Sequence, residues 1–298
     1  MTVTEMMMGE LTFGCELEYE GVGREHAAKA VAAAVGGTYH YEGSHLSNWV
    51  VKMPDGRKWN IVSDSSLGED FCSETTTPIL KIADMGMLLK VVDALKRAGA
   101  RTDYRTGLHI HVGAKDMTPV QIKNLVRIFY KQEELILKAA GTQEYRIQQY
   151  TRKTDHAFVD RICRMANPTM RKINVAWFGE YTPSPFHYDD HRYTALNLNN
   201  LWGYGSKYTV EFRFFEGTTN GEEIRANVLL ALLMVLKAKT AKAASAKNPL
   251  PYNEASGKYD LRVFLLRLGM IGTYYRKARN ILMKRMGGSA AWKDGRHD

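Results

Sequence analysis

Three short segments, far apart in the sequence, alternate charged and apolar side chains with a period of two. They are GCELEYE with Glu16, Glu18 and Glu20, GLHIHVG with His109 and His111, and TVEFRFFEGT with Glu211 and Arg213. Side chains two residues apart on a β-strand project from the same face of a sheet. Each segment is therefore predicted to be a strand with one apolar and one charged face, which favours a mostly antiparallel sheet.

The charged faces have two competing interpretations. Any one of them can be an ordinary solvent face, because antiparallel sheets are commonly covered on one side only. Glu-x-Glu-x-Glu is unusual for such a face, since adjacent like charges repel and Lys, Thr or Ser would be expected among them. A bound cation would remove that repulsion. Carboxylates with one or two imidazoles suit Mg²⁺ or Mn²⁺, whereas zinc sites favour His and Cys.

Arg213 follows Glu211 at the spacing that puts both on one face of the strand. Magnesium sites commonly serve phosphate groups, and a guanidinium beside one could stabilise charge on a phosphoryl group in transfer. A surface salt bridge to a neighbouring glutamate is the equal alternative.

The rest of the chain interleaves helices and strands. Helices are predicted at 26–35, 82–97, 119–140, 156–165, 220–244, 260–268 and 273–286, and strands at 10–20, 39–41, 49–53, 58–62, 107–113, 193–198 and 208–216. Thr118-Pro119-Val120-Gln121 has a capping-box pattern, and Pro54-Asp55-Gly56 predicts a hairpin turn. The polar segment 63–77 and the aromatic segment 167–188 are predicted to be loops. This order predicts the α+β class.

Several classes of protein do not fit the sequence. The first ten residues lack the basic and apolar regions of a secretion signal, and Val228–Leu236 is about half a bilayer span, which predicts a buried helix and no membrane partner. The three cysteines, Cys15, Cys72 and Cys163, have no C-x-x-C spacing. We therefore expect a cytoplasmic protein in a reducing compartment.

Five motifs carry a family resemblance when they are taken in order. They are FGCELEYE, SDSSL with SETTTPIL, TGLHIHVG, RYTALNLNNL and TVEFRFFEGTTN, within about residues 10 to 235. In this order they resemble the amidoligase family, which belongs to the carboxylate-amine ligases related to glutamine synthetase and glutamate-cysteine ligase.

The resemblance implies a glutamine-synthetase-like curved, mostly antiparallel sheet with helices packed on its convex side. Its concave face would hold ATP and two or three Mg²⁺ or Mn²⁺ ions. The substrate carboxylate would take the γ-phosphoryl group, and an amine would displace phosphate to form an amide or isopeptide bond. The activation is needed because a carboxylate is a poor electrophile at neutral pH.

The resemblance also implies roles for single residues. The implied metal ligands are Glu16, Glu18, Glu74, His109 and Glu211. His111 would lie nearer the nucleotide phosphates, Arg213 would face the transferred phosphoryl group, Arg192 and Asn197 would contact phosphate or substrate, and Asp64 would bind or deprotonate the amine.

Each of the less certain roles has a structural alternative. In its turn-rich loop, Asp64 could instead bond to its own backbone. Asn197 could satisfy backbone groups, and Arg192 could pair with Asp189 or Asp190. Glu20 has no role in the family and is predicted to be structural.

The basic charge of the chain is concentrated towards its C-terminus. From Lys237 onward there are 14 Lys and Arg against 4 Asp and Glu, whereas residues 1–236 carry 27 against 28. We predict a catalytic domain over residues 1–245 and a basic helical extension over 246–298. Its charges favour a solvated helix face, with an acidic or nucleic-acid partner as the alternative. Amine and carboxylate substrates remain unspecified, and so does the oligomeric state.

Two other functions therefore stay open. One is a phosphotransferase of the same fold, and the other is a nucleic-acid-binding or structural protein that retains a ligase-like fold.

Overall fold

The computed structural model of the chain describes residues 3–43, 48–63, 73–186, 188–203, 207–244 and 248–293. Within these residues the strands form one nine-stranded sheet in the order β2-β3-β4-β5-β1-β7-β9-β8, with β6 pairing to β1. Each of these strand pairs is antiparallel. The strands are β1 (Thr12–Tyr19), β2 (Thr38–Gly43), β3 (Asn48–Lys52), β4 (Lys58–Ser63), β5 (Ser73–Thr76), β6 (Leu80–Lys81), β7 (Gly107–Gly113), β8 (Leu196–Asn197) and β9 (Thr209–Glu216).

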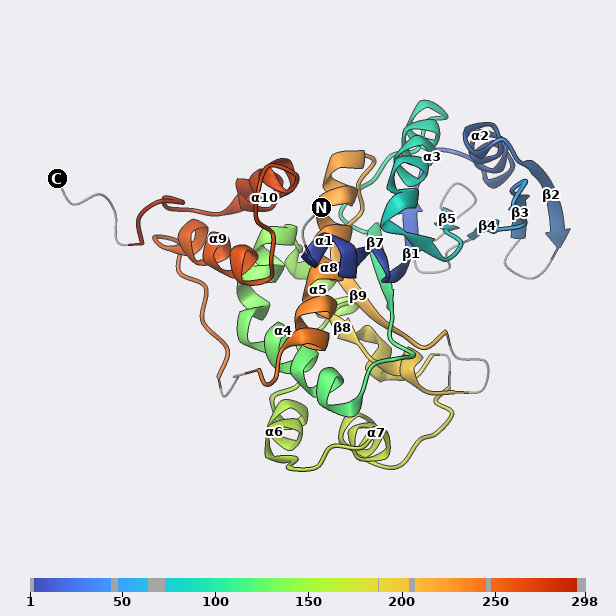
Figure 1. The fold of residues 1–298 in the computed structure, drawn as a ribbon. Helices are drawn as coiled ribbons and strands as arrows, with labels where there is room; N and C mark the ends of the chain where they lie inside the picture. The colour runs from blue at the N-terminus through green and yellow to red at the C-terminus, as the bar shows by residue number, and fades with distance from the viewer. Residues whose placement is uncertain are drawn as a thin grey trace.

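Two pairs of helices accompany the sheet (Figure 1). α2 and α3 accompany the β2–β5 end of the sheet, while α8 and α4 pack against each other beside β7 and β9. The helices are α1 (Val3–Gly9), α2 (Arg24–Val35), α3 (Met85–Arg97), α4 (Pro119–Ala140), α5 (Glu144–Gln149), α6 (His156–Arg164), α7 (Met170–Phe178), α8 (Gly221–Thr240), α9 (Gly257–Arg267) and α10 (Arg276–Leu282), with 3₁₀ turns η1 (Ile82–Asp84), η2 (Asp190–Tyr193), η3 (Asn199–Leu201) and η4 (Met283–Arg285). The predicted α+β class with a mostly antiparallel sheet is confirmed.

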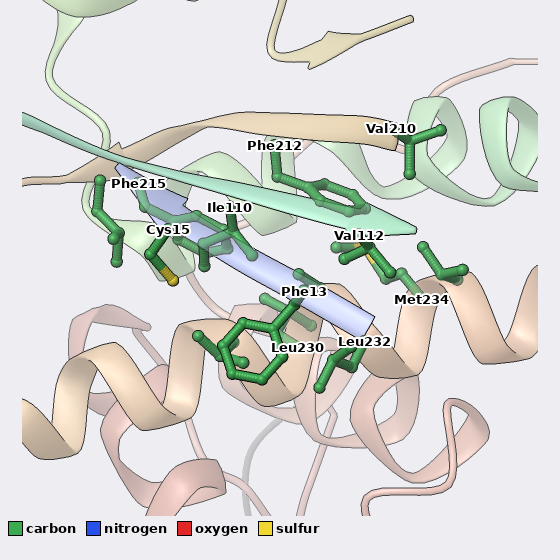
Figure 2. Packing of buried hydrophobic residues seen from close by; sticks show 14 of the residues in the cluster. Phe13, Cys15, Ile110, Val112, Val210, Phe212, Phe215, Leu230, Leu232 and Met234 are labelled. Atoms are coloured by element: carbon green, nitrogen blue, oxygen red, sulfur yellow. The ribbon is translucent and has the colours of Figure 1, made fainter. Parts of the chain in front are cut away.

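The core lies between the sheet and α8. Figure 2 shows the apolar side chains of β1, β7 and β9, among them Phe13, Ile110 and Phe212, facing Leu230 and Met234 of α8. α8 is buried along most of its length because apolar residues surround its axis, which is expected of a helix packed on several sides. Within the described residues, no helix combines the length and apolar character that a bilayer span requires.

Local sequence signals located several elements correctly. Thr118 accepts a hydrogen bond from the Gln121 N–H at the start of α4, as the capping box predicts. β3 and β4 form the predicted hairpin through Pro54-Asp55-Gly56.

Other predictions about the elements were wrong. Residues 73–76, expected in a loop, form β5 between β4 and β1, and residues 170–178 of the expected aromatic loop form α7. The strand expected at 193–198 is limited to Leu196–Asn197, since η2 extends to Tyr193. α1 and α5 were not predicted.

The basic C-terminal segment packs against the rest of the chain. α10 lies on α8 and α9 on α4, and Leu261 and Leu282 are buried in the same core as the sheet. Several of its cations are engaged within the protein. Lys277, for example, pairs with Glu222 at 3.0 Å, and Arg279 donates to the Met270 carbonyl oxygen at 2.8 Å. The acidic or nucleic-acid partner stays a prediction.

Candidate functional site

The three charged strand faces meet on the side of the sheet opposite α8. β1 pairs with β7 so that Glu16 lies across from His109, and β7 pairs with β9 so that His111 lies across from Glu211. On its other side β1 pairs with β5, which brings Glu74 opposite Glu18. Residues from four strands are thereby gathered on one face of the sheet.

Glu16 contacts both imidazoles. Its Oε2 lies 3.0 Å from His109 Nδ1, and its Oε1 lies 2.9 Å from His111 Nε2. Burial would raise the pKa of Glu16, but the charge of His111 and hydrogen bonds from both imidazoles outweigh this and hold that pKa well below its usual range. The two imidazoles therefore favour the ionised form of Glu16.

Glu211 accepts hydrogen bonds from three side chains. The Arg213 guanidinium donates to its Oε1, and Asn197 Nδ2 and Asn200 Nδ2 donate to its Oε2 at 2.7 Å and 3.3 Å. Burial would raise the pKa of Glu211, but Arg213 and His111 outweigh this effect and lower the pKa to about 2. A buried carboxylate is thus kept ionised by cations on the same face.

Three of these side chains could hold a metal ion together. Ligand atoms of Glu16, His111 and Glu211 all lie within 4.8 Å of one another. Two carboxylates and one imidazole form a hard donor set that fits Mg²⁺ or Mn²⁺. His111 belongs to this trio, whereas His109 lies beside it, with its Nε2 3.2 Å from Glu18 Oε1.

A comparison with known protein families identifies the family of the chain. The family model described as "Putative amidoligase enzyme" matches residues 9–235, which is most of the chain. The chain belongs to the amidoligase family. No curated protein matches the sequence of this chain.

Two cavities lie beside the trio. A cavity of about 280 Å³ lies at the His111 end, where Phe186, Trp202 and Lys207 line it. A smaller cavity of about 110 Å³ lies at the His109 end and is lined by Glu74 and four arginines, Arg105, Arg146, Arg192 and Arg213. Glu16 and Arg192 line both cavities, so the two spaces flank one line of charged side chains.

Of the residues proposed for the site, all but one fall in the part of the chain that the structure describes. Asp64 lies outside the described residues. Of the two partners suggested for Arg192, Asp190 bonds to Arg152, while Asp189 accepts hydrogen bonds from the backbone N–H of His191 and, through its carbonyl oxygen, from that of Arg192. The Arg192 guanidinium lies 5.5 Å from the Tyr188 ring centroid.

Glu20 is held by Arg105, whose Nη2 donates to its Oε2 at 2.8 Å. This contact agrees with the structural role predicted for Glu20.

Sequence reasoning missed three side chains of this region. Asn200, which donates to Glu211, lies three residues after Asn197 in the LNLNN motif, and that repetition of Asn was a usable signal. Lys207, whose Nζ lies 3.6 Å from Glu16 Oε1, and Arg146, which is fully buried, stand in segments without a recognisable motif.

Proposed function

We propose that this amidoligase is an ATP-dependent carboxylate-amine ligase that uses Mg²⁺ or Mn²⁺ and an acyl-phosphate intermediate. The observation that carries the proposal is the trio of Glu16, His111 and Glu211, with Arg213 bonded to the same carboxylate, in a chain of this family. A glutamine-synthetase-like curvature of the sheet, with the site on the concave face and helices on the convex face, is part of the proposal.

The acids and imidazoles would hold two or three metal ions. Glu16, His111 and Glu211 would form one set of ligands, and Glu18, Glu74 and His109, at the adjacent end of the face, would complete the others. When bound, the ions neutralise phosphate oxygens and so supply charge stabilisation for phosphoryl transfer. The low pKa of Glu211 supports this role, because the carboxylate needs no deprotonation before a cation binds.

The cations of the site would handle the negative charge of the substrates. Arg213 is buried and close to the trio, where a guanidinium stabilises an oxyanion more strongly than it would in water. Arg192 lines both cavities and so could bind a group that passes between them. We assign the 280 Å³ cavity, with its aromatic walls, to the nucleotide side and the 110 Å³ cavity to the carboxylate substrate.

In the first reaction step a carboxylate oxygen attacks the γ-phosphorus of ATP, and ADP leaves. In the second step the amine nitrogen attacks the acyl carbon, phosphate leaves with the bonding electrons, and the amine loses a proton. Closely placed reactants convert both attacks into intramolecular events, which is the main advantage of such a site.

The test is a screen for ADP release against pooled amino acids, polyamines and peptides, with mass spectrometry of the products. Once a substrate pair is found, we expect Glu211→Ala and Arg213→Ala to reduce turnover by about 10²–10³-fold, because each removes charge complementarity at the reacting phosphoryl group. ADP release by Glu211→Ala at the wild-type rate would refute the site.

Hydroxylamine separates a ligase from a phosphotransferase. An acyl phosphate reacts with it to give a hydroxamate, whereas a phosphoguanidine does not. Hydroxamate formation that depends on ATP supports the ligase, and a stable phosphorylated product without a hydroxamate supports the phosphotransferase.

A further inference from the structure

Arg146 is the most deeply buried cation of the region, with only 1% of its surface exposed. It lies in α5, outside every motif of the sequence. A buried guanidinium is costly unless its N–H groups and its charge find partners, so its contacts indicate what it does.

The two ends of the Arg146 guanidinium bond to two different parts of the sheet. Nη1 donates to the carbonyl oxygen of Arg105, just before β7, at 2.8 Å. Nη2 donates more weakly to the carbonyl oxygen of Arg213, in the middle of β9, at 3.4 Å. One side chain therefore connects the start of β7 to the residue that faces the trio.

The Arg213 carbonyl lies at an irregularity in the sheet. The register of β7 and β9 shifts between Leu108 and Ile110, which pair with Phe215 and Phe212, so Arg213 and Phe214 together oppose one residue of β7. A bulge of this kind interrupts the ladder and re-aims the side chains beside it. At such an interruption a carbonyl oxygen can lack its partner on the neighbouring strand, and a side chain from outside the sheet can donate to it instead. Arg146 donates in this way to the Arg213 carbonyl oxygen.

The same guanidinium lies next to the Glu18 carboxylate. Glu18 Oε2 accepts a hydrogen bond from the Gly107 backbone N–H at 2.6 Å and is 3.9 Å from Arg146 Nη1. The carboxylate is thus held at the start of β7 by one N–H and one adjacent charge.

Gly107 leaves the space that Arg146 occupies. A Cβ atom at this position would lie 2.2 Å from Arg146 Nη2 and 2.8 Å from its Cζ, so any side chain here must displace the guanidinium. Position 107 therefore requires glycine, because a larger residue would occupy the space of the guanidinium. A substitution of Gly107 can thus displace the Arg146 side chain while Arg146 itself is retained.

We propose that Arg146 is a positioning residue for the ligase site, fixing the β9 bulge that presents Arg213 and the orientation of Glu18. The inference rests on the proposed function for its catalytic meaning. The planar guanidinium of Arg146 donates hydrogen bonds in fixed directions, and these bonds, more than its charge, set the geometry of the cation-binding acids.

The test measures Mn²⁺ affinity, from the loss of the free-ion electron paramagnetic resonance signal, in Arg146→Met, Arg146→Lys and Gly107→Ala. We expect each to bind Mn²⁺ about 10–100-fold more weakly than wild type, as for other residues that orient ligands. Lysine retains the charge but cannot bond to two carbonyls in one plane. Arg97→Met, which removes an arginine from an exposed ion pair with Asp93 on α3, is the control and should match wild type.

A role of charge alone gives the opposite pattern. Loss of a cation near Glu18 would then strengthen Mn²⁺ binding in Arg146→Met and leave Arg146→Lys unchanged, and either result overturns the inference. Thermal denaturation of each variant identifies those that are folded. If Arg146→Met does not fold, Arg146→Lys and Gly107→Ala carry the same test.

A double variant checks that the two residues act together. Because Gly107→Ala is expected to act by displacing Arg146, it should change Mn²⁺ affinity by less than about twofold in the Arg146→Met background. If the losses of Mn²⁺ affinity in the two single variants multiplied in the double variant, the inference would be overturned. A wild-type protein that binds Mn²⁺ without any ATP turnover would refute the ligase proposal alone, whereas one that fails to bind Mn²⁺ would refute both.

Discussion

On β1, Cys15 points to the helix side of the sheet (Figure 2). Its neighbour Glu16 lies on the opposite face, where it contacts His109 and His111. The same alternation continues on β7 and β9, where Ile110 and Phe212 face α8 and His111 and Glu211 face the cavities. One face is held by apolar burial against α8 and the other by ion pairs and hydrogen bonds.

The comparison teaches how little separates a core position from a functional one. Burial of apolar surface stabilises the fold wherever it occurs. The clustered acids and imidazoles, by contrast, lose hydration when they are buried. Only the contacts that they make with one another offset the free-energy cost of that loss. We therefore expect substitutions on the two faces to affect different measurements.

The largest effect should come from the core face. Phe212→Ala removes a fully buried ring that contacts Phe129 of α4 and should lower the free energy of unfolding by about 3–5 kcal/mol. Urea denaturation measures this. Phe186, which is 73% exposed, provides the matched control, and Phe186→Ala should change the free energy of unfolding by less than about 0.5 kcal/mol. Equal losses in the two variants would contradict the assignment of the core.

On the functional face, Glu16→Gln should separate activity from stability. The carboxamide has the same size and can still hydrogen-bond to one imidazole, but it lacks the charge that a cation needs. We expect about 10²-fold lower ADP release, equivalent to about 2.7 kcal/mol of activation free energy, and a change in unfolding free energy below about 1 kcal/mol. A variant that stays fully active would break the comparison.

The smallest effect concerns a buried acid away from this face. Glu133 of α4 accepts hydrogen bonds from the Thr154 N–H and hydroxyl, both at 2.8 Å, but burial outweighs them and raises the pKa of Glu133. Its contribution to stability is therefore complete below the unfolded pKa near 4.5 and is lost as pH rises through the higher folded value. Relative to wild type, Glu133→Gln should gain stability between pH 4 and pH 8.

Glu211 should show the opposite sign in metal-free protein. Its folded pKa of about 2 lies below the unfolded value of 4.5, so its contribution is present above pH 4.5 and is lost as pH falls towards 2. Urea denaturation of Glu133→Gln and Glu211→Gln across pH 2–8 measures both. Curves that shift in the same direction would remove the distinction between the two kinds of buried acid.

The parts of the fold that were predicted depend on local chemistry. The alternation of Glu16 and Glu18 with apolar residues, and the capping box at Thr118, need only neighbouring residues to form. The pairing of β1 with β7 and of β7 with β9 was predicted only through the family resemblance, because the sequence of one strand does not determine which strand it pairs with.

The parts that were missed depend on distant partners. β5 has the polar sequence SETT and forms a strand because β1 and β4 provide ladders on both sides. α5 has six residues and no side-chain cap, so nothing local marks it, and Arg146 within it was missed for the same reason. α7 did have a signal, the cap at Thr169, which the aromatic composition of its surroundings obscured.

The position of α8 bears on how the chain is made in the cell. α8 is apolar on nearly all sides, and its outer surface is covered by α10, which is translated some 35 residues after α8 ends. A nascent chain therefore carries an uncovered apolar helix until Arg276–Leu282 leaves the ribosome. Released chains that end at residue 270 should consequently recruit chaperones more strongly than released chains that include α10.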